Sequence, residues 1–190
     1  MKLKHQIIDS INIKNSILED DTLFQELERA IDIIVQCYRN GSKVLFCGNG
    51  GSAADAQHLA AELSGRFYLD REPLNAEALH VNTSFLTAMA NDYSFDRVYE
   101  RMTLAVGKKD DVLIAFSTSG NSPNVLLALK AARKLKMRTI GFTGQSGGQM
   151  HGLCDILFCI PSEDTPRIQE VHILLGHIIC ENVEKMLFSE

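Results

Sequence analysis

Apolar and polar positions change their spacing along the chain, and the change predicts where helices give way to strands. Up to about residue 40, apolar residues recur every three or four positions, which is typical of amphipathic helices. The spacing predicts helices over residues 3–17 and 21–38, and Gly41 is expected to end the second. Both helices precede any strand. Residues 1–40 are therefore expected to form a helical hairpin whose apolar face packs on this domain or on another copy of it.

Beyond residue 41, short apolar runs bounded by glycine or polar residues predict buried strands. Helical spacing occupies the segments between most of these runs. Strands that alternate with helices favour an α/β fold in which a parallel sheet is covered on both faces. The predicted strands are 43–48, 75–82, 110–117, 137–144 and 154–161, and the predicted helices are 52–66, 85–91, 95–107, 123–136 and 166–188, with a short turn near 147–152.

Length and composition narrow the class of protein. The chain has 190 residues, 45% hydrophobic and 23% charged, which suffices for one globular domain with a buried core. The formal net charge of −5 argues against nucleic acid or a membrane surface as partner, since proteins that bind either usually carry a basic patch. The five cysteines form no CxxC pair, and no apolar stretch reaches the roughly 20 residues of a membrane span. We therefore expect a cytoplasmic protein.

Polar loops follow three of the predicted strands, at the sheet edge where open α/β folds bind ligands. The loop STSGNSP carries four hydroxyl groups, and its proline is well placed to open a helix. A helix N-terminus favours an anion, so this loop is either a phosphate cradle without a basic residue or a polar turn that caps a helix. The four hydroxyl groups belong to Ser117, Thr118, Ser119 and Ser122.

The loop GNGGS after the first predicted strand matches neither common nucleotide-binding pattern. Its glycines are Gly48, Gly50 and Gly51, which is not dinucleotide-loop spacing, and no lysine follows as a P-loop requires. Ser52 and Asp55 predict a capping box at the start of the next helix. Two such loops at one edge of the sheet favour a small phosphorylated ligand over a nucleotide.

Two helices carry groups that can move protons. Asp55, His58 and Glu62 share a polar face of the helix after GNGGS. His58 and Glu62 fit either a metal pair or a solvated surface pair, and the residues alone favour the surface pair. In the last helix His172 is expected to be a core residue. His177 lies among apolar neighbours, where a buried titratable group needs a partner.

Four segments at matching spacing resemble the phosphoheptose isomerase family, which belongs to the sugar isomerase (SIS) domain superfamily. The resemblance runs over about residues 20–188 and implies a single SIS domain, residues 1–190, with a sugar-phosphate-binding core over 41–190. It implies a flavodoxin-like three-layer sandwich around a five-stranded parallel sheet, assembled as a homotetramer. The four segments are KVLFCGNGGSAADAQHLAAELSGRF, LTAMANDYSFDRVYERM, STSGNSPNVLLALKAAR and TPRIQEVHILLGHIICENVE.

The resemblance also implies an activity and a set of site residues. Members of the family convert sedoheptulose 7-phosphate to D-glycero-D-manno-heptose 7-phosphate, for lipopolysaccharide or capsule heptose. Glu62 and His177 match the catalytic pair. The positions that bind zinc in some relatives are matched by His58, Glu62, Gln169 and His177. Because one of these ligands is an amide, zinc binding is expected to be optional. No nucleotide is expected as a cofactor. The substrate contacts are matched by Asn49, Gly50, Gly51, Ser52, Glu62, Asn91, Asp92, Ser117, Thr118, Ser119, Ser122 and Gln169.

Two positions depart from the family pattern, and two other functions stay open. Asn82 replaces a usual aspartate and Ser94 a usual glycine, which is expected to leave the catalytic pair intact but can alter substrate preference. One alternative is a non-catalytic tetrameric SIS-domain protein that associates with the bacterial replication initiator. Such proteins lack a glutamate at position 62, so Glu62 favours the enzyme. The other alternative is an isomerase of a different sugar phosphate.

The predicted phosphate loops and the predicted catalytic pair lie far apart on one helix. A helix rises about 1.5 Å per residue, so Glu62 is about 15 Å along the helix from Ser52. A sugar phosphate spans less than this distance. We therefore expect active sites at subunit interfaces, where Glu62, His58 or His177 reaches the loops of a neighbouring copy.

Overall fold

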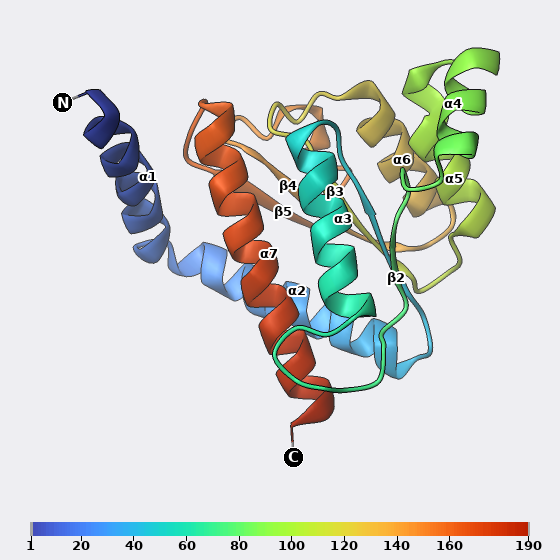
Figure 1. Ribbon diagram of the computed structural model, residues 1–190, viewed down its shortest axis with the longest axis horizontal. Coiled ribbons are helices and arrows are strands. Elements are labelled where there is room, and N and C mark those ends of the chain that lie inside the picture. The colour runs from blue at the N-terminus through green and yellow to red at the C-terminus, as the bar shows by residue number, and fades with distance from the viewer. Residues whose placement is uncertain (1, 190) are drawn as a thin grey trace.

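The computed structural model describes residues 2–189 and has a parallel sheet as the middle of three layers (Figure 1). Residues 1 and 190, the ends of the predicted domain, lie outside the described part. The order of the strands in the sheet is β2-β1-β3-β4-β5, and every neighbouring pair is parallel. The predicted α/β sandwich is therefore confirmed. The strands are β1 (Val44–Cys47), β2 (Ala76–Ala78), β3 (Val112–Phe116), β4 (Arg138–Gly144) and β5 (Ile156–Ile160).

Helices cover both faces of the sheet, each over its own apolar core. One core lies between the sheet and α2, α3 and α7, and the other between the sheet and α4, α5 and α6. Within residues 2–189, no helix combines the length and the apolar character that crossing a membrane requires. The helices are α1 (Lys2–Leu18), α2 (Asp21–Arg39), α3 (Gly51–Ser64), α4 (Thr83–Asp92), α5 (Val98–Val106), α6 (Pro123–Lys134) and α7 (Thr165–Phe188), with 3₁₀ turns at η1 (Phe95–Arg97) and η2 (Gly148–Met150).

The two N-terminal helices come before the sheet, as predicted, but they differ in how much they bury. Helix α2 packs its apolar side on the sheet and on α7. It ends at Arg39, and Gly41 follows the C-cap Asn40 with a φ of +70°, which suits glycine. Helix α1 leads away from the body of the molecule (Figure 1). Its side chains Leu3 and Ile7 are 79% and 65% exposed. Helix α1 thus presents apolar surface that this chain leaves uncovered.

Strand β2 is shorter than the predicted segment 75–82. Only Ala76–Ala78 pair with β1, at the edge of the sheet. Asn82 is instead the N-cap of α4, where its side chain accepts a hydrogen bond from the backbone N–H of Phe85 at 3.0 Å. The chain therefore turns away from the sheet early, because an asparagine before a helix satisfies free backbone donors better than a ladder position does.

His172 is a core residue, as the sequence predicts. Its ring is fully buried, and its Nε2 lies 3.2 Å from the carbonyl oxygen of Thr143, which assigns the proton of the neutral ring to Nε2. The other ring nitrogen, Nδ1, is buried and has no partner among the described residues. Burial lowers the pKa of His172 to about 4, because protonation would place a charge and an unpaired donor in an apolar core.

This buried ring predicts an acid-sensitive step in stability. In the unfolded chain histidine takes up a proton near pH 6.5, so between pH 6.5 and about 4 the unfolded state binds more protons and stability falls as the pH falls. We expect the free energy of unfolding of the wild type to fall by about 2–3 kcal/mol between pH 7 and 4.5 because of His172. His172→Gln, which keeps a donor to Thr143, should lack this fall. Urea unfolding of both proteins at several pH values measures it. Identical pH dependences would show that His172 does not contribute.

Candidate active site

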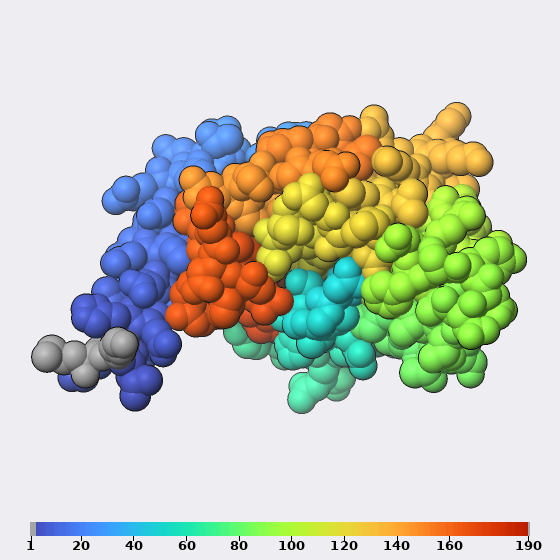
Figure 2. Space-filling view, turned by 90° about the horizontal axis from the view of Figure 1, so that it is seen from above, coloured from blue at the N-terminus to red at the C-terminus, as the bar shows by residue number. Residues whose placement is uncertain are grey.

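A pocket of about 300 Å³ lies at the carboxyl-terminal edge of the sheet. Figure 2 looks onto this edge from above, where the start of α3 (cyan), the loop after β3 (yellow) and the start of α7 (orange-red) meet. The pocket is lined by Asn49, Gly50, Gly51, Ser52, Phe116, Ser117, Thr118, Ser122, Thr165 and Gln169. All of these except Phe116 and Thr165 were predicted as substrate contacts, so the structure brings most of the predicted binding residues together.

The pocket has the electrostatic character of an anion site although none of its lining residues is charged. Three helices begin there: Gly51 starts α3, Ser122 is the N-cap of α6, and Thr165 starts α7. Each N-terminus offers backbone N–H groups without helical partners and the positive end of the helix dipole. Their convergence favours an anion such as phosphate. Thr165 was missed because the sequence alone does not show that α7 begins beside the other two.

The hydroxyl groups of the STSGNS loop differ in where they point. Ser122 is the N-cap of α6, as predicted, but its side chain makes no capping hydrogen bond. Its Oγ instead lies 2.9 Å from the Oγ of buried Ser117, inside the loop. Ser119 is exposed, accepts a hydrogen bond from the backbone N–H of Asn121 at 3.1 Å, and does not line the pocket. The structure thus favours Ser117 and Ser122 over Ser119 as residues that contact a molecule bound in the pocket.

The predicted capping box at Ser52 and Asp55 is wrong. Helix α3 begins one residue earlier, at Gly51, and its N-cap is Gly50, which has a φ of +56° and no side chain to cap with. Ser52 is consequently inside the first turn, buried and part of the pocket wall. One carboxylate oxygen of Asp55 is buried and has no hydrogen-bond partner among residues 2–189, and burial raises the pKa of Asp55.

A pair of asparagines joins the GNGGS loop to the start of α6, and the sequence analysis missed one of the two, Asn124. The Nδ2 of Asn49 donates to Oδ1 of Asn124 at 2.9 Å, and the reverse bond measures 2.8 Å. Asn124 is only 2% exposed. A polar residue among the buried apolar positions of α6 was the available signal. The pair fixes the GNGGS loop against the start of α6, so both loops present their donors in one arrangement.

A second cluster lies on the sides of α3 and α7. The Nε2 of His58 is 3.1 Å from Oε1 of Glu62 and 3.0 Å from Nε2 of His177. The ring of Phe67 stacks on His177, with centroids 5.7 Å apart. The side chain of His58 is 51% exposed and that of Glu62 is 21% exposed. The predicted catalytic pair and the predicted metal ligand His58 are therefore neighbours. The half-buried His177 has a polar partner, His58, as expected for a titratable group among apolar neighbours.

Within one chain the pocket and this cluster are separate. Helices α3 and α7 both start at the pocket and run the same way from it (Figure 1). Glu62 therefore lies about 15 Å along α3 from Ser52, and His177 about 12 Å along α7 from Gln169. Gln169 packs beside Gly51, where a Cβ would approach its amide to 2.7 Å. The structure thus leaves Gln169 with the pocket and does not join it to His58, Glu62 and His177.

The predicted contacts Asn91 and Asp92 also lie outside the pocket lining. Both are exposed at the end of α4, where the Nδ2 of Asn91 donates to Oδ1 of Asp92 at 2.9 Å. The two departures from the family pattern leave this region intact. Asn82 caps α4 as an aspartate would, and Ser94 has an extended backbone with φ −168°, which any residue adopts.

Ser122→Ala is expected to raise the KM for a phosphorylated sugar about tenfold, since it removes a hydroxyl donor beside three helix N-termini, a loss of about 1–2 kcal/mol. Ser119→Ala is the matched control from the same loop and is expected to change KM less. Inorganic phosphate should compete with the sugar in the wild type and in both variants. Steady-state kinetics measures both effects. A larger effect at Ser119, or no competition by phosphate, would show that the phosphate binds elsewhere.

Comparison with known proteins gives one consistent family. The SIS domain family model matches residues 11–144. The chain is 52% identical over 188 residues to the phosphoheptose isomerase of Clostridium acetobutylicum, covering 99% of this chain and 96% of that protein. It is also similar to the solved structures of phosphoheptose isomerases from Neisseria gonorrhoeae (TM-score 0.91, 42% identity) and Francisella tularensis (TM-score 0.92, 35% identity), each covering 97% of both chains.

Proposed function

Because the chain belongs to the phosphoheptose isomerase family of SIS-domain proteins, we propose that it interconverts sedoheptulose 7-phosphate and D-glycero-D-manno-heptose 7-phosphate. The enzyme is thus an aldose–ketose isomerase, and its product serves heptose synthesis for lipopolysaccharide or capsule. The observation that carries the proposal is the cluster in which His58 contacts both the carboxylate of Glu62 and the imidazole of His177, in a chain that also forms a pocket without charged side chains.

The chemistry needs one group that exchanges a proton with carbon and one that exchanges a proton with oxygen. We assign Glu62 to carbon: it takes the proton from C1 of the ketose, and the electron pair of that bond forms the C1–C2 double bond of an enediol. His177 acts at oxygen by protonating the former carbonyl oxygen at C2. The second half transfers the O1 proton to His177 and returns the proton from Glu62 to C2, which leaves an aldehyde at C1. Both groups end in their starting protonation states.

The pocket supports this chemistry by holding the phosphate away from the reacting carbons. Hydroxyl groups of Ser117 and Ser122 and the N-termini of α3, α6 and α7 provide donors without a cationic side chain. Phosphate held at one end of a seven-carbon sugar positions C1 and C2 at the other end. Fixing the substrate in this way removes much of the entropy cost of bringing it to the catalytic groups.

The cluster also suits a zinc ion, which we propose as an optional cofactor. The ligand atoms of His58, Glu62 and His177 lie within 4.8 Å of one another, and two imidazoles with one carboxylate are ordinary zinc ligands. The two Nε2 atoms face each other at 3.0 Å, as ligands of one ion would. Bound zinc would polarise the carbonyl of the sugar. Gln169, the fourth predicted ligand, reaches such an ion only from a neighbouring chain.

We further propose that the active site is completed by another copy of the chain, in a homotetramer. The separation of about 12–15 Å along α3 and α7 exceeds the reach of one small sugar. The exposed apolar residues of α1, with Leu174 and Phe188 of α7, offer surface for self-association. Packing of α3 and α7 between copies would place Glu62 and His177 of one chain at the phosphate pocket of the next.

The alternative of a non-catalytic SIS-domain protein is not favoured. Relatives named as phosphoheptose isomerases are 45–54% identical to the chain, and Glu62 lies within contact of His58. A different sugar phosphate would use the same phosphate pocket, so substrate choice needs a direct test.

Incubation of the purified protein with sedoheptulose 7-phosphate is that test. We expect an aldoheptose 7-phosphate to accumulate towards equilibrium, detected by its aldehyde-derived anomeric proton signals. Fructose 6-phosphate, a ketose with the same phosphate end and one carbon fewer, is the matched control and is expected to react far more slowly. Absence of aldoheptose product with folded protein would contradict the proposal. Faster turnover of fructose 6-phosphate would show that the enzyme is an isomerase of a different sugar phosphate.

A further inference from the structure

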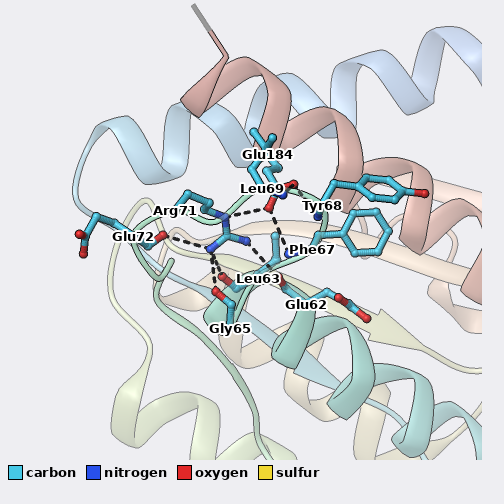
Figure 3. A network of polar contacts seen from close by, with 9 residues as sticks. All are labelled: Glu62, Leu63, Gly65, Phe67, Tyr68, Leu69, Arg71, Glu72 and Glu184. Atoms are coloured by element: carbon cyan, nitrogen blue, oxygen red, sulfur yellow. Dashed lines mark hydrogen bonds and ion pairs between the residues drawn. The ribbon is translucent and has the colours of Figure 1, made fainter.

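A buried ion pair between Arg71 and Glu184 lies at the end of α3 that carries Glu62 (Figure 3). The Nε of Arg71 donates to Oε2 of Glu184 at 3.0 Å, and their side chains are 3% and 1% exposed. Moving two charges out of water is costly, and such a pair stabilises a fold only when further hydrogen bonds satisfy both groups. The partners of this pair are therefore informative about what it holds in place.

Arg71 closes the end of helix α3. The helix ends at Ser64 without a left-handed glycine cap, since Gly65 has a φ of −92°. The guanidinium supplies the missing donors instead: Nη2 to the carbonyl of Glu62 at 3.0 Å, and Nη1 to that of Leu63 at 2.8 Å. These carbonyls belong to the last turn of α3. Because Glu62 itself is in that turn, Arg71 fixes the backbone from which the proposed base projects.

Glu184 holds the loop that follows α3. Its two carboxylate oxygens accept the backbone N–H groups of Phe67, Tyr68 and Leu69 at 3.1, 2.8 and 2.8 Å (Figure 3). Burial by itself raises the pKa of Glu184, but these three donors and Arg71 outweigh it and lower the pKa overall, so the carboxylate is ionised at neutral pH. The charge on Glu184 is thus part of the structure of the loop.

The loop leads directly to His177. Phe67, the first residue whose N–H binds Glu184, stacks its ring on the imidazole of His177. His177 and Glu184 are also seven residues apart on α7, which places them on one face of that helix. One ion pair therefore holds both the helix end that carries Glu62 and the aromatic ring that packs against His177.

We propose that Arg71 and Glu184 are positioning residues: their ion pair sets the relative placement of Glu62 and His177 without contact with the sugar. The proposal rests on the proposed isomerase function and names residues that act through the catalytic pair. Its physical basis is that a small misplacement of an acid–base group lowers the rate strongly while leaving distant binding contacts unchanged.

Glu184→Gln tests the carboxylate. An amide offers one acceptor oxygen where the carboxylate offers two, so the donors of Phe67 and Arg71 would face an NH₂ group. We expect kcat to fall between about tenfold and 10²-fold, with the inhibition constant of inorganic phosphate changed less than about twofold. Arg71→Lys keeps the positive charge but lacks the fork that reaches several carbonyls, and a similar split is expected. If Glu184→Gln does not fold, the kinetics of Arg71→Lys test the positioning role instead.

The chain offers a matched control at the other end of the sheet. Asp111 is also a buried carboxylate in an ion pair, with Nζ of Lys43 at 2.6 Å, and it also accepts backbone N–H groups, from Lys43 and Lys108. Asp111→Asn should lower the melting temperature as Glu184→Gln does but leave kcat per folded protein unchanged. Equal losses of kcat in Glu184→Gln and Asp111→Asn would show that loss of any buried ion pair lowers kcat, and would overturn the proposal.

A spectroscopic readout separates this inference from the proposed function. The ring protons of His177 sense the ring current of Phe67, so at fixed pH in zinc-free protein their NMR signals should move in Glu184→Gln and Arg71→Lys and stay in Asp111→Asn. Unmoved His177 signals overturn the positioning role whatever the turnover. If the wild-type protein does not isomerise the heptose phosphate, the proposed function fails, and the His177 signals still decide whether the ion pair places that ring.

Discussion

Glu62→Gln is expected to lower kcat for the heptose phosphate by at least about 10²-fold, the contribution typical of a general acid–base group. The amide has nearly the same shape and can still contact His58, which lies 3.1 Å from the Glu62 carboxylate. It cannot accept the carbon-bound proton, so the first step of the reaction is lost. The phosphate pocket is untouched, and inorganic phosphate should bind the variant as it binds the wild type.

The measurement is steady-state turnover with phosphate inhibition in parallel. Glu181→Gln is a suitable control, since Glu181 is a carboxylate on α7 whose partner is Lys185 at 2.6 Å, outside the cluster. It should retain wild-type kcat. Near-normal turnover by Glu62→Gln would remove Glu62 from the mechanism, and an equal loss in the control would point to a general effect of charge removal.

Most of the fold follows from local pattern. Apart from one strand, the alternation of buried runs and helical spacing predicted the strands and helices of the described chain to within a few residues, because a parallel sheet covered on both faces leaves a strong apolar signal. The exception is β2 at the sheet edge. There the pattern continued to Asn82, but pairing stopped at Ala78 because the capping preference of Asn82 prevailed.

The candidate site was predictable only in part. Hydroxyl-rich and glycine-rich loops after strands predict a phosphate pocket, and the structure brings those loops together around one pocket. The start of α3 was missed by one residue, because Gly50 can take a left-handed backbone that ends the loop before Ser52. Thr165 and Asn124 matter through contacts between segments distant in sequence, which no local spacing reveals. The same holds for Arg71 and Glu184.

The second large effect expected is recovery of activity from two inactive proteins. Ser122→Asp places a negative charge in the phosphate pocket and should abolish sugar binding, while aspartate remains a favourable N-cap for α6. Glu62→Gln lacks the base but keeps its pocket. If each active site combines the pocket of one chain with Glu62 of another, random mixing of equal amounts restores about a quarter of the sites. If each site lies within one chain, none is restored.

Subunit exchange between these two variants tests most directly whether the phosphate pocket and the acid–base cluster form one isomerase site across a subunit interface. The two chains carry different affinity tags, so that mixed oligomers can be isolated and their exchange verified before turnover of sedoheptulose 7-phosphate is measured. A site shared between subunits predicts about a quarter of wild-type activity in fully mixed oligomers, against almost none in either parent. Mixed oligomers that remain as inactive as the parents would contradict it.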